Sequence, residues 1–144
     1  MTTTDDPGAR LYLAFAEIFN ARAYDRLGEV LTPDFTDHHP GLVDVAGLDE
    51  YRRNLAVVVE ALDRRAEPHD VASAGDMVYT RVMLTGQHVG TFLGLESTGT
   101  GLSWYTHEIW RVDGDRFRER WAVDDLHGLL GQIGYPLPTW TDPA

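Results

Sequence analysis

The sequence contains no cysteine, which excludes disulfide bonds, a thiol nucleophile, iron–sulfur ligation and cysteine zinc sites. Basic residues are scarce, since 12 Lys and Arg stand against 23 Asp and Glu, for a formal net charge of −11. A surface this acidic repels a phosphate backbone, so we expect no nucleic-acid partner. The longest strongly apolar stretch, residues 55–62, is too short to cross a bilayer, and the N-terminal residues lack the pattern of a signal peptide. We therefore expect a cytoplasmic protein with no membrane association.

The 144 residues have the length of one ordinary domain. A chain of that size buries roughly 70% of its unfolded surface, so it needs no disulfide bond or metal to be stable. Hydrophobic residues make up 43% and charged residues 24%, which is typical of globular proteins. No repeat or linker interrupts the chain. We expect residues 1–144 to form a single domain, with frayed ends at 1–6 and 141–144.

Helical patterns occupy the N-terminal half. Asp6 followed by Pro7 is typical of an N-cap and the first position of a helix, and apolar residues then recur at helical spacing to about Asn20. A shorter helix is expected over 24–31, and a third over about 47–62.

After Pro68 the pattern alternates, which predicts strands at 77–84, 102–112 and 116–123. Asp113-Gly114 between the last two is a strong hairpin signal. Helices followed by a meander of strands indicate an α+β fold, with the helices on one face of an antiparallel sheet.

The last strand carries the candidate chemistry at Asp125. Alternation places this residue on the same face as three apolar side chains, those of Phe117, Trp121 and Val123. Glu119 shares that parity too. A carboxyl group in an apolar space has a raised pKa, which suits a general acid or base. The alternative interpretation is that Asp125 caps a short helix over 126–133.

Histidines supply a second candidate group. His107 lies on the neighbouring predicted strand, where it either faces Asp125 or is a buried structural histidine. His38 and His39 lie on a predicted loop, at a pocket mouth or in solvent. A two-histidine, one-carboxylate metal site can be assembled from these residues with Asp37, but nothing in the spacing requires it, and we expect no metal.

Three segments resemble the SnoaL-like polyketide cyclases, in the same order along about residues 11–136. They are Phe35-Thr-Asp37-His-His39-Pro40; Gly86-Gln-His88-Val-Gly90-Thr-Phe92-Leu-Gly94 with Thr98-Gly99; and Glu119-x-Trp121-x-x-x-Asp125-x-x-Gly128-Leu129-Leu130-x-Gln132-Ile133-Gly134. The chain departs from the family pattern at Gln87 and Thr100, and residues 42–48 give no clear match.

The resemblance implies an α+β NTF2-like cone in which three N-terminal helices pack on a bent, mostly antiparallel sheet and enclose a hydrophobic pocket. It implies a cofactor-independent cyclase of antibiotic biosynthesis that closes a polyketide ring by aldol chemistry. The family's acid/base aspartate falls on Asp125 and its pocket histidine on His107. The expected substrate-binding residues are Tyr12, Phe15, Phe35, His39, Arg81, His88, Trp104 and Trp121.

Other functions stay open for this fold. An epoxide hydrolase requires a carboxylate–arginine–carboxylate set, for which Arg81 with Asp125 and Glu119 is the candidate. A hydroxylase, or a binding or interaction module without catalysis, is also compatible with the pattern. A homodimer through the outer sheet face is expected in either case, with Trp110 as a candidate interface residue if the chain is a binding module.

Overall fold

The computed structural model describes residues 5–40, 42–135 and 137–141. Of the ends expected to fray, residues 1–4 and 142–144 lie outside the described residues. Asp6 is ordered into the start of the first helix, because its carboxylate accepts a hydrogen bond from the Ala9 amide at 3.1 Å. Within the described residues, no helix combines the length and apolar character needed to cross a membrane.

The N-terminal helices agree with the pattern of the sequence. Helix α1 covers Pro7–Asn20, a 3-10 helix, η1, covers Tyr24–Glu29, and helix α2 covers Leu48–Leu62. A further helix, α3, covers Leu126–Ile133. Its N-cap is Asp125, whose side chain accepts a hydrogen bond from the Gly128 amide at 2.9 Å.

The six strands form one sheet in the order β2-β1-β6-β5-β4-β3. Strands β4 (Met77–Gln87), β5 (Gly101–Asp113) and β6 (Arg116–Asp124) were expected, and the Asp113-Gly114 turn joins the last two. Strands β1 (Leu31–His39), β2 (Val43–Ala46) and β3 (Arg65–Ala74) were not. The loop expected at His38 and His39 is therefore wrong, because this segment pairs parallel with β6 and antiparallel with β2.

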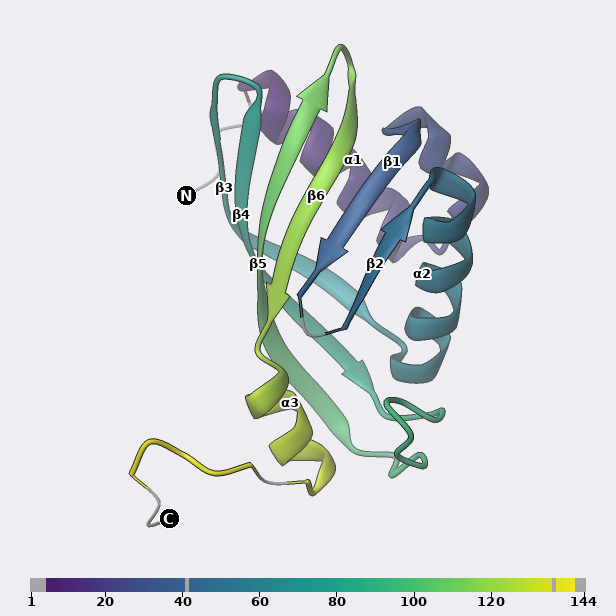
Figure 1. Cartoon of the computed structure of the whole chain (residues 1–144), viewed down its shortest axis with the longest axis vertical. Helices are drawn as coiled ribbons and strands as arrows, with labels where there is room; N and C mark the ends of the chain where they lie inside the picture. The colour runs from purple at the N-terminus through teal and green to yellow at the C-terminus, as the bar shows by residue number, and fades with distance from the viewer. Residues whose placement is uncertain (1–4, 41, 136, 142–144) are drawn as a thin grey trace.

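The helices and the sheet enclose an interior space. Figure 1 shows α1 behind the sheet, α2 beside β2, and β3 to β5 curving along their length. Helix α1 packs on β3 and β4, α2 packs on β1, and α3 packs on β5. This is the expected α+β fold, a bent and mostly antiparallel sheet covered by helices, although one of the three N-terminal helices is a 3-10 helix.

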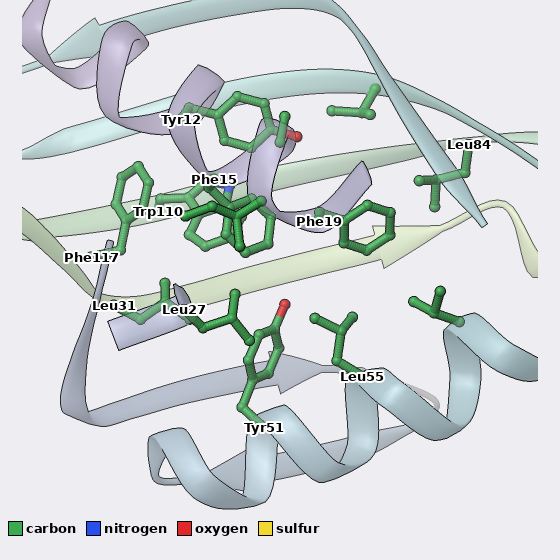
Figure 2. Packing of buried hydrophobic residues seen from close by; sticks show 14 of the residues in the cluster. Tyr12, Phe15, Phe19, Leu27, Leu31, Tyr51, Leu55, Leu84, Trp110 and Phe117 are labelled. Atoms are coloured by element: carbon green, nitrogen blue, oxygen red, sulfur yellow. The ribbon is translucent and has the colours of Figure 1, made fainter. Parts of the chain in front are cut away.

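The core is centred on Trp110, which is fully buried on β5. Its ring contacts those of four aromatic residues from α1, β1 and β6: Tyr12, Phe15, Phe35 and Phe117. Figure 2 shows Tyr51 and Leu55 pointing from α2 toward this cluster. Trp110 is a core residue, so the expectation that it lies at a dimer interface is wrong.

A bulge in β6 decides which of its side chains face inward. Arg111 of β5 pairs with Glu119, but the next residue, Val112, pairs with Phe117, so β6 contains one extra residue. The inward parity therefore changes after Phe117, as expected at a bulge. Its effect is to place Arg120, Ala122 and Asp124 on the inner face, where the sequence predicted Trp121, Val123 and Asp125.

Candidate active site

A cavity of about 310 Å³ lies between α1, α2 and the inner face of the sheet. This volume is at the lower end of the range for small-molecule sites, roughly 300–1,000 Å³. Most of its wall is apolar, including Phe15, Phe19, Leu55, Val82, Leu84 and Trp104. Many of the polar lining groups lie on β1, β5, β6 and α2, and the others include Tyr12 of α1 and Arg64 in the turn after α2.

One polar group is the pair formed by Asp124 at the end of β6 and His39 at the end of β1. His39 Nε2 lies 2.8 Å from Asp124 Oδ1, and both side chains line the cavity. Two further donors hold the Asp124 carboxylate: the Trp104 indole Nε1 at 2.8 Å and the Thr106 hydroxyl at 2.9 Å. The side chain of Asp124 is only 6% exposed. The carboxylate is therefore fixed by three side chains from β1 and β5.

These contacts keep Asp124 ionised. Burial raises the pKa of its carboxyl group, but the hydrogen bond to His39, the Trp104 donor and the charge of Arg120 together lower that pKa well below its usual range. A carboxylate that accepts several hydrogen bonds behaves in this way. Asp124 is thus a fixed negative charge beside the imidazole of His39.

A second polar group joins β1, β5 and β6 through Arg120. The Arg120 guanidinium donates to Asp37 Oδ1 at 2.7 Å and to Glu108 Oε2 at 2.7 Å. Glu108 Oε1 accepts from the Tyr12 hydroxyl at 2.9 Å and from the Thr80 hydroxyl at 2.8 Å. This leaves Asp37 Oδ2 beside His39 Nδ1, at 4.0 Å. The two polar groups therefore meet at His39.

The buried charges reinforce one another. Burial lowers the pKa of Arg120, but the charges of Asp37 and Glu108 outweigh it and raise that pKa well above its usual value. Burial and the neighbouring Glu108 raise the pKa of the Tyr12 hydroxyl well above its usual range. Arg120 is therefore a permanent cation and Tyr12 a permanent hydrogen-bond donor. Asp37, with one oxygen on Arg120, keeps the other directed to the His39 side.

The residues considered for a metal do not gather. Asp37 and His39 face the cavity, whereas His38 stacks on Trp121 and bonds Glu119 at 2.7 Å, and His107 is exposed on the outer face. Among residues 5–40, 42–135 and 137–141, no three His, Asp or Glu side chains form a group that could hold a metal ion.

Comparison with known proteins assigns the chain to a family, because residues 9–133 match the profile of the SnoaL-like polyketide cyclases. The chain belongs to this family. It is 28% identical over 129 residues to the aklanonic acid methyl ester cyclase AcmA of Streptomyces galilaeus, covering 85% of this chain and 87% of AcmA. It is 25% identical over 115 residues to DauD, the aklanonic acid methyl ester cyclase of Streptomyces sp. strain C5, and the match covers 78% of this chain and 70% of DauD.

Solved structures agree with this assignment. IdmH of Streptomyces antibioticus superposes with a TM-score of 0.79 at 25% identity, covering 88% of this chain and 98% of IdmH. A SnoaL-like polyketide cyclase of Agrobacterium tumefaciens strain C58 has a TM-score of 0.74 at 24% identity, covering 93% and 100% of the two chains. The expected cone fold and the expected polyketide cyclase role are confirmed.

The structure corrects the placement of four expected site residues of this cyclase. Asp125 is exposed at the N-cap of α3, so the capping interpretation is the correct one. His107 lies on the outer face of β5. Arg81 pairs with Asp70 on the outer face, and Trp121 stacks there on His38. The outward placement of all four residues follows from the alternation of β4, β5 and β6, in which the inward-facing residues have even numbers apart from Phe117.

The other expected residues lie inside the fold. Tyr12, Phe15, His39 and Trp104 line the cavity. Phe35 and His88 are fully buried but are not among its lining residues. Phe35 packs under Tyr51 and Trp110. His88 Nδ1 lies 3.0 Å from the Thr98 hydroxyl, which fixes the loop after β4.

Several polar residues of the lining were missed by sequence reasoning: Asp37 as a site group by itself, Tyr51, Asn54, Arg64, Glu108, Arg120 and Asp124. A signal was present in β5, where even positions carry Leu102, Trp104 and Trp110. The same parity places Glu108 inside. An inward glutamate contradicts a simple apolar alternation, and this polar interruption concealed the correct face.

Proposed function

We propose that this cyclase closes a ring of an aromatic polyketide by an intramolecular aldol reaction, without a cofactor, using His39 and Asp124 as the acid/base pair. The observation that supports it is the 2.8 Å contact of the two side chains within an otherwise apolar cavity. Asp124 thus takes the acid/base role that the family resemblance implied for the next residue, Asp125.

The chemistry follows from the hydrogen bonds. With Asp124 ionised, His39 holds a proton on Nε2, which leaves the lone pair of Nδ1 free to take a proton from the carbon next to a substrate carbonyl. The enolate carbon then bonds to a second carbonyl carbon, and His39 returns the proton to the new alkoxide. Asp124 stabilises the imidazolium in between, as a carboxylate does in a catalytic triad. The product has the mass of the substrate before any loss of water.

Shape contributes to the same reaction. Holding two reacting ends of one molecule in contact is worth on the order of 7–11 kcal/mol, which exceeds a typical single acid/base contact. The aromatic walls of Phe15, Phe19 and Trp104 are suited to fold a polycyclic substrate. Tyr51 and Asn54 from α2 also line the cavity, and we assign them to hydrogen bonds with substrate oxygens.

The relatives indicate the class of substrate. AcmA and DauD are both named for aklanonic acid methyl ester. We propose that this chain acts on a related polycyclic aromatic polyketide in antibiotic biosynthesis. Its cytoplasmic location stays a prediction from the sequence.

Mass spectrometry of the product tests this assignment on a panel of aromatic polyketides. We expect the wild type to yield a product of unchanged mass and altered retention, or that mass minus water. Asp124→Asn should lower kcat by about 10²–10⁴-fold, the usual contribution of a general acid or base. Asp125→Asn is the matched control, since asparagine is as good an N-cap as aspartate, and it should retain wild-type activity. Full ring closure by Asp124→Asn, or its loss in Asp125→Asn alone, would disprove the assignment.

A second candidate function is supported by Asp37, Arg120 and Glu108. They form the carboxylate–arginine–carboxylate set that an epoxide hydrolase requires, in place of the set expected around Arg81. Asp37 Oδ2 would take a proton from water as the water oxygen opens the epoxide, and that proton would then pass to the epoxide oxygen, so the diol product would have the mass of the substrate plus one water. The same mass measurement separates this reaction from ring closure.

We also propose a homodimer through the outer face of the sheet. The side chains of Tyr79, Ile109 and Val123 are exposed there, Val123 by 60%, around a shallow hollow that Trp121 and Pro40 also line. Neighbouring exposed apolar side chains of this kind mark interaction surfaces. We expect a dimer in light scattering of the wild type and a monomer for Val123→Asp. A wild-type monomer, or a dimer that survives this substitution, would contradict the proposal.

A further inference from the structure

Arg64 is a charged group of the cavity that the proposed acid/base chemistry does not use. It lies in the turn between α2 and β3, directly after Asp63, whose backbone is left-handed with φ 46°. Arg22 holds this turn, because its guanidinium pairs with the Asp63 carboxylate at 2.9 Å and donates to the Arg64 carbonyl oxygen. The backbone is thus fixed from outside, while the Arg64 side chain lines the cavity.

The guanidinium of Arg64 has no polar partner among the described residues. Its Nε is buried without a hydrogen bond, and no carboxylate in the described ranges lies within 4.0 Å of the group. Its Cζ lies over the Phe19 ring, 5.6 Å from the centroid. Burial lowers the pKa of Arg64, but a guanidinium stays protonated in proteins. Among the residues that the structure describes, the guanidinium therefore lies against an aromatic wall without an ion pair in direct contact, and Asp124 attracts it only from a distance.

The other charges of the cavity are already matched. Arg120 is shared between Asp37 and Glu108, and Asp124 accepts from three donors. None of these carboxylates is free to move to Arg64 without leaving its own donor unpaired. Leaving a buried charge unpaired costs free energy, and an anionic ligand removes that cost.

We propose that Arg64 binds a carboxylate of the substrate, so that the polyketide cyclised by this chain is a free acid rather than its ester. The inference rests on the proposed function and names the substrate class of the same cavity. The planar fork of an arginine matches the two oxygens of a carboxylate and gives a bidentate contact. A neutral ester offers no charge to this group. A carboxylate held there also keeps the fused rings against Phe19.

Calorimetric binding of a matched pair of probes tests the proposal without any turnover. The probes are 9-anthracenecarboxylic acid and its methyl ester, which share the rings and differ in the charge. We expect the wild type to bind the acid at least tenfold more tightly than the ester. Arg64→Met should abolish that preference, and Arg64→Lys should keep part of it, because the charge remains but the fork is lost. Arg65→Met, a change at the exposed neighbouring arginine, is the control and should match the wild type.

The outcomes separate the two proposals. Equal binding of acid and ester by the wild type, binding of neither, or an acid preference that survives in Arg64→Met would overturn the carboxylate site. Melting curves confirm that each variant is folded, so a loss of binding in Arg64→Met is not unfolding. Asp124→Asn should keep the acid preference while losing ring closure. If the acid preference holds but no polyketide is cyclised, the reaction assignment fails and the carboxylate site does not.

Discussion

Loss of Arg120 should destabilise the fold strongly. Its guanidinium neutralises two buried carboxylates at once. Nη1 contacts Asp37 Oδ1, and both Nε and Nη2 contact Glu108 Oε2, each at 2.7 Å. Arg120→Met keeps much of the side-chain volume but leaves both carboxylates in the interior without a counter-charge. Removing one partner of a buried ion pair costs about 3–5 kcal/mol, because the remaining charge is uncompensated. We expect a loss of that size in the free energy of unfolding at pH 7.

Urea unfolding followed by circular dichroism measures this loss. The matched control is Arg111→Met on the outer face, whose ion pair with Asp76 at 3.1 Å joins side chains that are 34% and 58% exposed. Exposed pairs contribute about 0–1 kcal/mol, so the control should remain close to the wild type. Adding Asp37→Asn and Glu108→Gln to Arg120→Met should recover part of the stability, since the stranded charges are then gone. A loss below 1 kcal/mol for Arg120→Met, or one equal to the control, would refute this account of the interior.

Two further changes probe the fold around the site. Because the pKa of Asp124 is lowered in the folded state, its stabilisation is complete above the ordinary pKa of 3.8 and is lost as the pH falls toward the lowered folded value. The stability difference between the wild type and Asp124→Asn should therefore shrink between pH 6 and pH 2.5 in denaturant titrations, and a constant difference would contradict the shift. Gly86→Ala should destabilise by about 1–3 kcal/mol, since the added methyl group would overlap the Leu62 carbonyl oxygen. Gly131→Ala, with open space around it, is the control and should be neutral or stabilising in thermal melts.

Local signals in the sequence were sufficient for the elements whose ends are encoded nearby. The start of α1 at Asp6-Pro7 is predicted correctly from the sequence, because a capping carboxylate and a proline act within one turn of helix. The Asp113-Gly114 turn is also predicted correctly, because its signal is local: Gly114 takes the positive φ of 67° that such a turn needs. The family motifs, which are also local, identified the fold and the cyclase role.

The candidate site depended on contacts between residues far apart in the chain. Strand β1 forms because β6 and β2 pair with it, and neither partner is visible in its own sequence. The bulge in β6 is a property of the pairing with β5, and it moved the inward carboxylate from Asp125 to Asp124. The sequence by itself determined the N-terminal helices, strands β4 to β6, the family and the presence of an acidic residue at the end of the last strand. Only the tertiary structure decided which carboxylate faces the cavity and that Arg64 has no direct ion pair among the described residues, because strand register and charge pairing are set by long-range packing.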